Sequence, residues 1–252
     1  MESNGKISVI MPAYQAAAYI GRAIESVQKQ TCSEPWELLV IDDGSTDGTD
    51  RIVRAYAASD KRIRYLRRRR NRGVSAARNL GIAKAAGTYA AFLDADDWWD
   101  AKKLSMQMAC IRRTGAVLCC TGRELVRADG STTGRVIPVP ERITYRMLMH
   151  TNVIPCGSVL ARMDAVREFG FVNDRCHEDY ILWLRLLKKY GPAAGVNVPA
   201  LKCRLSAGGK SRNKWKSACM QYGSYRYMGY GRVRSFYYML FYTLNGIRKY
   251  MG

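Results

Sequence analysis

Three carboxylates lie within four positions of the segment FLDADDWW at 92–99, namely Asp94, Asp96 and Asp97. They follow an apolar run that is typical of a buried strand. Carboxylates this close repel one another unless a cation lies between them. Divalent ions such as Mg²⁺ and Mn²⁺ take oxygen ligands and complete their shell with substrate phosphates. The cluster therefore indicates a metal site, and the simpler alternative is a turn in which Asp97 or Asp100 caps the next helix.

A second acidic segment, VIDDGSTDGT at 40–49, follows another apolar run. Its carboxylates can accept hydrogen bonds from a nucleotide base or from ribose hydroxyls, whereas DDGS alone is equally typical of a turn. Asp47 is placed to cap a helix expected over 49–58. A nucleotide-binding role gains support because two acidic segments follow two separate strands.

Two further segments carry candidate groups. NRGVSAARNLGI at 71–82 offers glycine and small residues at a helix start, where anions bind, with Arg78 one turn inside. The alternative there is an ordinary capped helix. CHEDYILWL at 176–184 places Glu178 and Asp179 in the first turn of a helix, where a base and a simple partner of the helix dipole are both possible. His177 is more typical of a polar surface or cap position than of a metal ligand.

The elements that position these groups alternate between strand and helix. Apolar runs predict strands, and helical spacing predicts the segments between them; the strands are expected at 7–12, 36–42, 63–66, 88–94 and 116–121, and the helices at 16–30, 49–58, 74–86 and 100–113. Such alternation favours an α/β fold with a mostly parallel central sheet. Ligands bind at the carboxyl ends of such strands, so both acidic segments are expected to face one crevice.

The pattern changes after Thr121. A polar stretch at 122–142 contains ADGS, which predicts a hairpin turn at 128–131. Short strands are expected at 158–161 and 201–205, separated by an amphipathic helix over 177–191.

Five motifs in this order carry a resemblance to a known family: PAYQAAAYI, VIDDGSTDGT, NRGVSAARNLGI, FLDADD and HEDYILWLRLL. Together they resemble the family 2 glycosyltransferases over about residues 6–205. The segment SAGGKSRNKW at 206–215 resembles the one that follows the catalytic domain in bacterial members building lipopolysaccharide or capsule. The resemblance implies a single nucleotide-sugar-binding α/β domain of the GT-A type that inverts the anomeric centre.

The resemblance also implies site residues. It places the nucleotide base at Asp43, the ribose at Asp94, the diphosphate near Arg78, a Mg²⁺ or Mn²⁺ ion at Asp96 and the catalytic base at Asp179. The full set of implied donor-binding residues is Pro12, Ala13, Tyr14, Asp43, Asn71, Arg78, Asp94 and Ala95.

This chain departs from the family pattern in two places. It carries four arginines at 67–70, where members commonly have an acidic or small polar residue. Many relatives have a histidine within the stretch that corresponds to 203–209, where this chain has none. Arg204, Lys210 and Arg212 are candidates to replace that contact to the diphosphate.

The expected function is transfer of a hexose or N-acetylhexosamine from a nucleotide sugar, with UDP favoured, to a hydroxyl group. The acceptor is expected to be a saccharide or a lipid-linked saccharide in cell-surface polysaccharide synthesis. A carboxylate that removes the acceptor proton and a divalent ion that stabilises the departing diphosphate fit this chemistry.

The charge distribution suggests where the enzyme works. The net charge is +20, and residues 180–252 hold 14 Lys and Arg but no Asp or Glu. We expect a domain over 1–205 and a basic, aromatic, helical extension over 206–252 that binds an anionic membrane surface or packs on the domain. With no recognisable signal peptide, the expected place is the cytoplasmic face of the cell membrane.

Two other classes of protein fit the sequence less well. A nucleic-acid-binding protein would use the same positive charge, but acidic strand ends repel phosphate, so no nucleic acid is expected as a partner. An enzyme that attaches nucleotides to sugars would carry a glycine-rich N-terminal signature, which PAYQAAAY lacks. The eight cysteines form no C-x-x-C pair, which argues against a zinc site.

Overall fold

Uninterrupted apolar runs form the centre of the sheet. In this computed structural model, which describes residues 5–172, 175–205 and 214–251, every residue of β1 (Ile7–Ala13) and β2 (Trp36–Asp42) is buried. Burial on both faces is what continuous apolar strands require. With β3 (Ile63–Arg67) and β4 (Tyr89–Phe92) they form a parallel set in the order β3-β2-β1-β4.

The sheet continues beyond β4 to ten strands within the described residues. The remaining strands are β5 (Trp98–Trp99), β6 (Leu118–Val126), β7 (Thr132–Ile137), β8 (Arg142–Ile143), β9 (Val159–Arg162) and β10 (Ala193–Arg204). β9 enters antiparallel between β4 and β6, while β6 and β10 pair in parallel. The long pairings are parallel, so the predicted mostly parallel sheet is confirmed, but the antiparallel insertion of β9 was not predicted.

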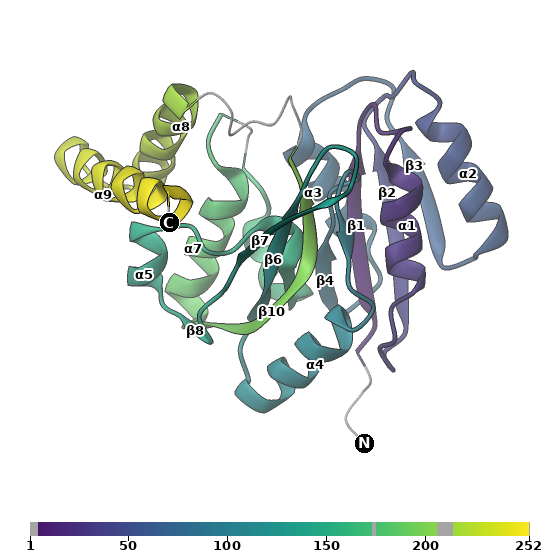
Figure 1. Ribbon diagram of the computed structural model, residues 1–252, viewed down its shortest axis with the longest axis horizontal. Coiled ribbons are helices and arrows are strands. Elements are labelled where there is room, and N and C mark those ends of the chain that lie inside the picture. The colour runs from purple at the N-terminus through teal and green to yellow at the C-terminus, as the bar shows by residue number, and fades with distance from the viewer. Residues whose placement is uncertain (1–4, 173–174, 206–213, 252) are drawn as a thin grey trace.

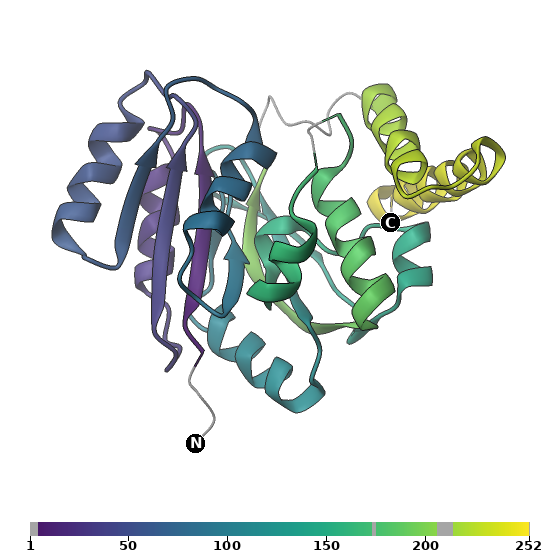
Figure 2. The same cartoon turned by 180° about the vertical axis from the view of Figure 1, so that it is seen from behind.

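Helices cover both faces of the sheet (Figures 1 and 2). Their bounds are α1 (Ile20–Gln28), α2 (Thr49–Ser59), α3 (Val74–Lys84), α4 (Lys103–Thr114), α5 (Tyr145–His150), α6 (Met163–Phe169), α7 (Glu178–Tyr190), α8 (Lys214–Tyr227) and α9 (Arg232–Met251). Side chains alternate along β1, so Val9 packs with α1, α2 and α4, whereas Ile10 packs on the face covered by α3, α6 and α7. Two apolar cores, one on each face, therefore hold the strand ends in place.

Several predicted boundaries are corrected. α1 begins at Ile20 rather than at residue 16, because the backbone N–H groups of Ala16 and Ala17 bond to the neighbouring loop. The strand expected at 201–205 is the end of the longer β10. The hairpin turn predicted at 128–131 is present and joins β6 to β7.

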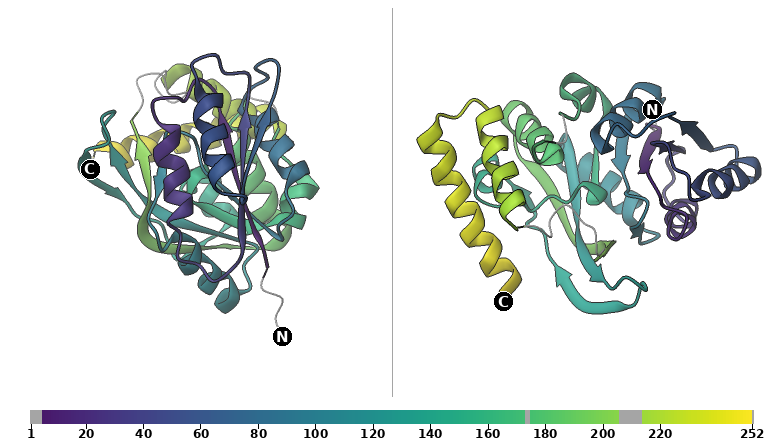
Figure 3. Two further views of the ribbon diagram at one scale, coloured as in Figure 1. Left: turned by 90° about the vertical axis from the view of Figure 1, so that its right-hand side faces the viewer. Right: turned by 90° about the horizontal axis from the view of Figure 1, so that it is seen from above.

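The C-terminal helices lie beside α5 and α7 (Figure 3). Tyr225 of α8 is fully buried, and its hydroxyl donates to the carbonyl oxygen of Met149 at 2.7 Å. The inner side of this helical pair therefore packs on the rest of the fold. The predicted division at 205/206 falls at the edge of 206–213, outside the described residues. Within the described residues, no helix has the length and apolar character needed to cross a membrane.

Candidate functional site

Two strand-to-helix loops are joined at the carboxyl end of the parallel strands. In the loop after β1, the backbone N–H of Gln15 donates to Ser45 Oγ at 3.0 Å, and that of Ala16 donates to Thr49 Oγ1 at 2.9 Å. The N–H of Ala17 donates to Asp47 Oδ2 at 2.9 Å. Because these bonds link segments about 30 residues apart, they give the loops one fixed relative position.

Asp42 and Asp43 are adjacent in sequence but differ in their surroundings. Asp42 is fully buried, and its carboxylate accepts from the Ser45 N–H at 2.8 Å and from the Tyr65 hydroxyl at 2.6 Å. It therefore shapes the loop. Asp43 Oδ2 accepts two backbone N–H groups, from Arg72 and Gly73, while Oδ1 is buried, faces Arg68 in an ion pair and accepts no hydrogen bond within the described residues. Asp43, unlike Asp42, lines the pocket described below.

Gly73 makes the contact with Asp43 possible. Its φ angle is 89°, in a region that L side chains rarely adopt. This backbone directs the Gly73 N–H to Asp43 Oδ2 at 2.8 Å, immediately before α3 begins. The start of α3 and the end of β2 thereby enclose one space.

That space is a pocket of about 360 Å³. Eight residues predicted from the resemblance line it or flank its acidic wall: Pro12, Ala13, Tyr14, Asp43, Asn71, Asp94, Ala95 and Asp96. The expectation that both acidic segments face one crevice is confirmed. Arg78 and Asp179 do not line the pocket.

The acidic turn after β4 contains one structural and two available carboxylates. Asp97 is buried and accepts the backbone N–H of Arg204 at 2.8 Å, so it ties the turn to the end of β10. Burial raises the pKa of Asp96, and the neighbouring charge of Asp94 raises it further. Burial also raises the pKa of Asp97 well above its ordinary value, with Asp94 and Asp96 adding to the shift. This turn concentrates negative charge that a cation would stabilise.

The donor set fits Mg²⁺ or Mn²⁺ bound jointly with a substrate. Among the described residues, no three His, Cys, Asp or Glu side chains are grouped to hold an ion by themselves. Such ions commonly take only one or two protein carboxylates and complete their shell with water and phosphate oxygens. Asp96 on the pocket wall meets that requirement.

Arg78 connects the acidic turn to α7. It is 4% exposed, and its Nη2 lies 2.7 Å from Asp94 Oδ1, while Nη1 lies 3.1 Å from Glu178 Oε1. The guanidinium also stands 5.2 Å from the ring of Phe171. Arg78 therefore holds two carboxylates that are far apart in sequence, and it reaches the pocket through Asp94.

Glu178 and Asp179 are distinguished by this contact. Glu178 is buried and paired with Arg78. Asp179 is half-buried and accepts only the N–H of Tyr180 at 2.7 Å among the described residues. The carboxylate of Glu178 is thus paired with a cation, whereas that of Asp179 forms no ion pair in the described part of the chain.

The arginines at 67–70 partly compensate the acidic loops. Arg67 donates to the carbonyl oxygen of Ser45 at 3.0 Å and lies 3.5 Å from Asp50. Arg68 lies 3.3 Å from Asp43 Oδ1 in an ion pair. These two arginines therefore have partners within the fold, which gives this departure from the family pattern a local structural role.

Further pocket residues were not predicted as site residues. Tyr19 lines the pocket at the end of the loop before α1, and Gln15, Ala16, Gly73, Val74 and Ala77 complete its wall. Tyr19 is 37% exposed, which is unusual for a large aromatic residue at a helix start. The position of Tyr19 within the motif PAYQAAAYI is the sequence signal that could have identified it as a pocket residue.

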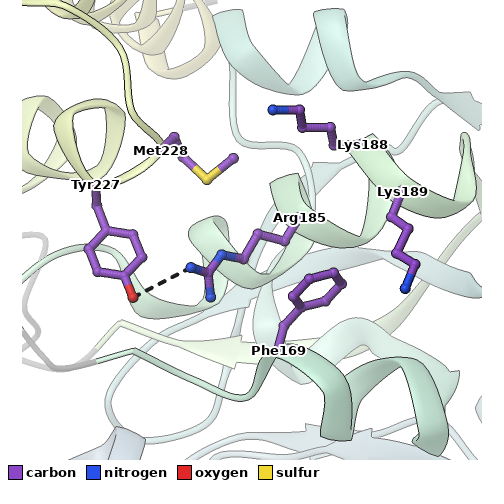
Figure 4. Close-up of a pocket in the computed structure, with 6 residues that line it drawn as sticks. All are labelled: Phe169, Arg185, Lys188, Lys189, Tyr227 and Met228. Carbon is purple, nitrogen blue, oxygen red and sulfur yellow. Dashed lines mark hydrogen bonds between the residues drawn. The ribbon is translucent and has the colours of Figure 1, made fainter.

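A second hollow, of about 420 Å³, lies between α6, α7 and α8 (Figure 4). Its lining consists of Phe169, Arg185, Lys188, Lys189, Tyr227 and Met228. None of these side chains is a carboxylate, so this hollow lacks the oxygen ligands that Mg²⁺ and Mn²⁺ prefer.

Known proteins resemble this chain in sequence. The family model described as "Glycosyl transferase family 2" matches residues 8–170. WfgD of Escherichia coli, named as a UDP-Glc:alpha-D-GlcNAc-diphosphoundecaprenol beta-1,3-glucosyltransferase, is 34% identical over 251 residues, which cover 97% of this chain and 94% of that protein. TuaG of Bacillus subtilis, a glycosyltransferase named for teichuronic acid biosynthesis, is 36% identical over 221 residues and 87% of each chain.

Solved structures share the fold. TarS of S. aureus in complex with UDP-GlcNAc matches with a TM-score of 0.72 at 19% identity, over 96% of this chain and 75% of that one. The mannosyltransferase PcManGT of Pyrobaculum calidifontis, in complex with GDP-Man and Mn²⁺, matches with a TM-score of 0.70 at 17% identity, over 93% of this chain and 70% of that one. The expected single α/β domain is confirmed.

Proposed function

The chain belongs to glycosyl transferase family 2, and from that premise we propose that it transfers a hexose or N-acetylhexosamine from a UDP-sugar to a hydroxyl group of a lipid-linked saccharide. The observation that carries this proposal is the convergence of Asp43, Asp94 and Asp96 on one pocket. One end of that pocket suits a nucleoside, and the other suits a metal-bound diphosphate. Similarity to WfgD and TuaG places the reaction in bacterial cell-surface polysaccharide synthesis.

Asp43 supports a preference for uridine. Its Oδ2 is occupied by two backbone N–H groups, and its Oδ1, which lies 3.3 Å from Arg68 in an ion pair, accepts no hydrogen bond in the part of the chain that the structure describes. A uracil ring presents one N–H donor, which a carboxylate oxygen accepts. Tyr14, 51% exposed at the pocket, offers a ring on which the base can stack. In this arrangement Asp94 accepts from ribose, with its other side held by Arg78.

Asp96 would hold Mg²⁺ or Mn²⁺ together with the donor diphosphate. When bound, such an ion stabilises the negative charge that develops on the departing nucleoside diphosphate. The protein fixes the turn from behind, because Asp97 accepts the Arg204 N–H and Arg204 Nε donates to the carbonyl oxygen of Asp96.

Asp179 would act as the general base. Its carboxylate forms no ion pair among the described residues, and it begins α7 beside the Arg78–Asp94 contact. A carboxylate that removes the acceptor proton while the hydroxyl attacks the anomeric carbon from the side opposite UDP gives inversion of configuration.

The test of this function is release of UDP from a panel of nucleotide sugars, with and without Mn²⁺. We expect one UDP-sugar to be turned over, with activity lost in excess chelator and restored by Mn²⁺. Turnover of no nucleotide sugar, with salt-dependent binding to random oligonucleotides instead, would replace the proposal with nucleic-acid binding.

The outward face of α9 supports action at the cytoplasmic face of an anionic membrane. Its exposed apolar side chains follow helical spacing: Val233, Phe236, Tyr237, Leu240 and Phe241. Arg232 and Arg234 are exposed on the same helix. Apolar side chains enter the headgroup region, and each nearby Lys or Arg contributes about 1 kcal/mol on an anionic surface. A lipid-linked acceptor would be presented at such a surface.

Sedimentation with liposomes tests this placement. Binding is expected with phosphatidylglycerol vesicles, and it should weaken with salt and fall strongly in a Phe236→Ser/Leu240→Ser variant. Val136→Ser is the matched control, because Val136 is 49% exposed on β7. Equal recovery in the supernatant with neutral and anionic vesicles at low salt would contradict membrane binding.

A further inference from the structure

Two arginines converge on one tryptophan beside the acidic turn. The guanidinium carbon of Arg22, on α1, lies 3.4 Å from the ring centroid of Trp98, and that of Arg204, at the end of β10, lies 5.2 Å away. Arg204 also lies 4.6 Å from the ring of Tyr19, which lines the acidic pocket. The two arginines and Trp98 therefore stand next to this pocket, although none of the three lines it.

The tip of the β6–β7 hairpin covers the same point. A Cβ atom added to Gly130, whose φ is 86°, would meet Nη1 of Arg22 first, then the Trp98 ring at 3.6 Å and Nη1 of Arg204 at 3.7 Å. Arg204 also donates to the carbonyl oxygen of Ala128 in this tip. These short distances show that both guanidinium groups reach one small region beside the hairpin tip.

The charges in this region are only partly balanced, because the charge of Arg204 acts on the carboxylate of Asp96. Among the described residues, neither arginine forms an ion pair with a carboxylate, and the guanidinium hydrogen bonds of Arg204 go to main-chain oxygens of Asp96 and Ala128. Burial lowers the pKa of Arg22, and the neighbouring Arg204 lowers it further. Each guanidinium has five N–H donors, most of which stay available here. Two adjacent cations with open donors are stabilised by an anion that both can reach.

We propose that Arg22, Arg204 and Trp98 form a phosphate-binding site for the acceptor. A phosphate group has enough oxygen atoms to accept paired hydrogen bonds from two guanidinium groups at once. The site lies outside the pocket wall that would bind UDP, on the far side of Tyr19 and against the turn of Asp96. It therefore selects acceptors whose sugar is attached to a phosphate or diphosphate, and holds that group while the sugar hydroxyl is at the acidic pocket. This assignment rests on the proposed transferase function.

Binding of an alkyl diphosphate tests the site without requiring turnover. Calorimetric titration of geranyl diphosphate is carried out on the full chain saturated with UDP and Mg²⁺, for the wild type and Arg22→Ala. Because Arg22 is exposed on α1, its removal leaves the fold intact. Loss of hydrogen bonds to a charged group should weaken binding about ten- to a hundredfold. Arg22→Lys should restore part of the affinity, because it keeps the charge but not the planar fork.

The matched control is Arg51→Ala, an exposed arginine on the adjacent helix α2, which should bind the probe as the wild type does. A second titration, with UDP alone, separates the two sources of phosphate. We expect Arg22→Ala to bind UDP as the wild type does. Weaker UDP binding with unchanged probe binding would assign the arginines to the donor and overturn the proposal, as would probe binding that Arg22→Ala leaves unchanged.

Failure of the transferase function gives a different result. In that case no UDP-sugar is turned over by the wild type, whatever the titrations show. Where transfer is observed, Arg22→Ala should raise the KM for a diphosphate-linked acceptor about ten- to a hundredfold. The KM for the same sugar as its methyl glycoside should stay unchanged. Equal effects on both acceptors would count against a phosphate site.

Discussion

Nη2 of Arg78 lies 2.7 Å from Oδ1 of Asp94, and this contact joins the acidic turn to the helix that carries Asp179. The opposite end of the same guanidinium holds Glu178 at 3.1 Å. A buried cation between two carboxylates sets their positions before any substrate arrives. Of the two acids that begin α7, Asp179 is the one without an ion pair among the residues that the structure describes.

Loss of Arg78 should destabilise the fold and displace the acidic turn. Arg78→Ala leaves Asp94 and Glu178 without their shared partner, and breaking a buried pair in this way costs about 3–5 kcal/mol. Urea unfolding measures the change. Arg162→Ala, which removes an exposed pair with Asp164, is the control and should cost less than about 1 kcal/mol. Equal losses of unfolding free energy in both variants would show that the ion pairs of Arg78 stabilise the fold no more than an exposed pair does.

Asp179→Asn should bind donor normally and lose transfer. The amide cannot take a proton, so the transfer rate should fall about 10²–10⁴-fold or more, while the Kd for UDP stays at the wild-type value. Glu178→Gln is the contrasting variant, because it weakens an ion pair but leaves Asp179 in place. A collapse of donor affinity in Asp179→Asn, with a high residual rate, would move the role of base elsewhere.

Asp96→Ala should abolish metal-dependent donor binding and leave the fold intact. Removing one of several crowded carboxylates relieves repulsion, so the free energy of unfolding should stay equal or rise. Donor titrations with and without Mn²⁺ measure the loss. Asp100→Ala is a suitable control, since Asp100 is exposed and its carboxylate accepts only the N–H of Lys102 within the described residues. Near-normal turnover of Asp96→Ala would exclude Asp96 as the metal ligand.

Stability should depend on pH through Lys103. This side chain is fully buried, bonds to Gln107 at 2.7 Å and lies 3.9 Å from the ring of Trp99; burial lowers its pKa to about 7. Above that pH the unfolded chain binds more protons than the folded one. The free energy of unfolding should therefore rise with pH, by at most about 1.4 kcal/mol per unit.

The useful window for this measurement is pH 7 to about 8.5. Burial raises the pKa values of Cys119, Cys120 and Cys156 near Lys103, so their ionisation in the unfolded chain opposes the trend at higher pH. Lys103→Met should remove the slope and be more stable than the wild type near pH 6. If the free energy of unfolding changed with pH in the same way in the wild type and in Lys103→Met, Lys103 would have the same charge in the folded and unfolded chains.

Sequence patterns predicted the parts of the fold that depend on residues close together in the chain. The run WELLVID is β2 as predicted, and the two acidic segments follow β2 and β4, which lie on either side of β1 with their carboxyl ends at one edge of the sheet. Long-range partners had no local signal. Glu178 meets Arg78 from 100 positions away, and Asp97 holds Arg204 from 107. The direction of β9 could not be predicted either, because a strand of four residues carries no pattern that specifies parallel or antiparallel pairing.

Ser224 of α8 has a consequence for anyone redesigning this chain. Its buried hydroxyl accepts the backbone N–H of His177 at 3.1 Å, directly before the two acids that begin α7. A truncation that removes the C-terminal helices would leave that N–H without its acceptor and destabilise the start of α7. It would also remove any membrane-binding surface on α9. Loss of activity in a truncated protein would then be misread as loss of targeting. Replacing outward side chains of α9, and leaving the length alone, separates where the enzyme resides from how it works.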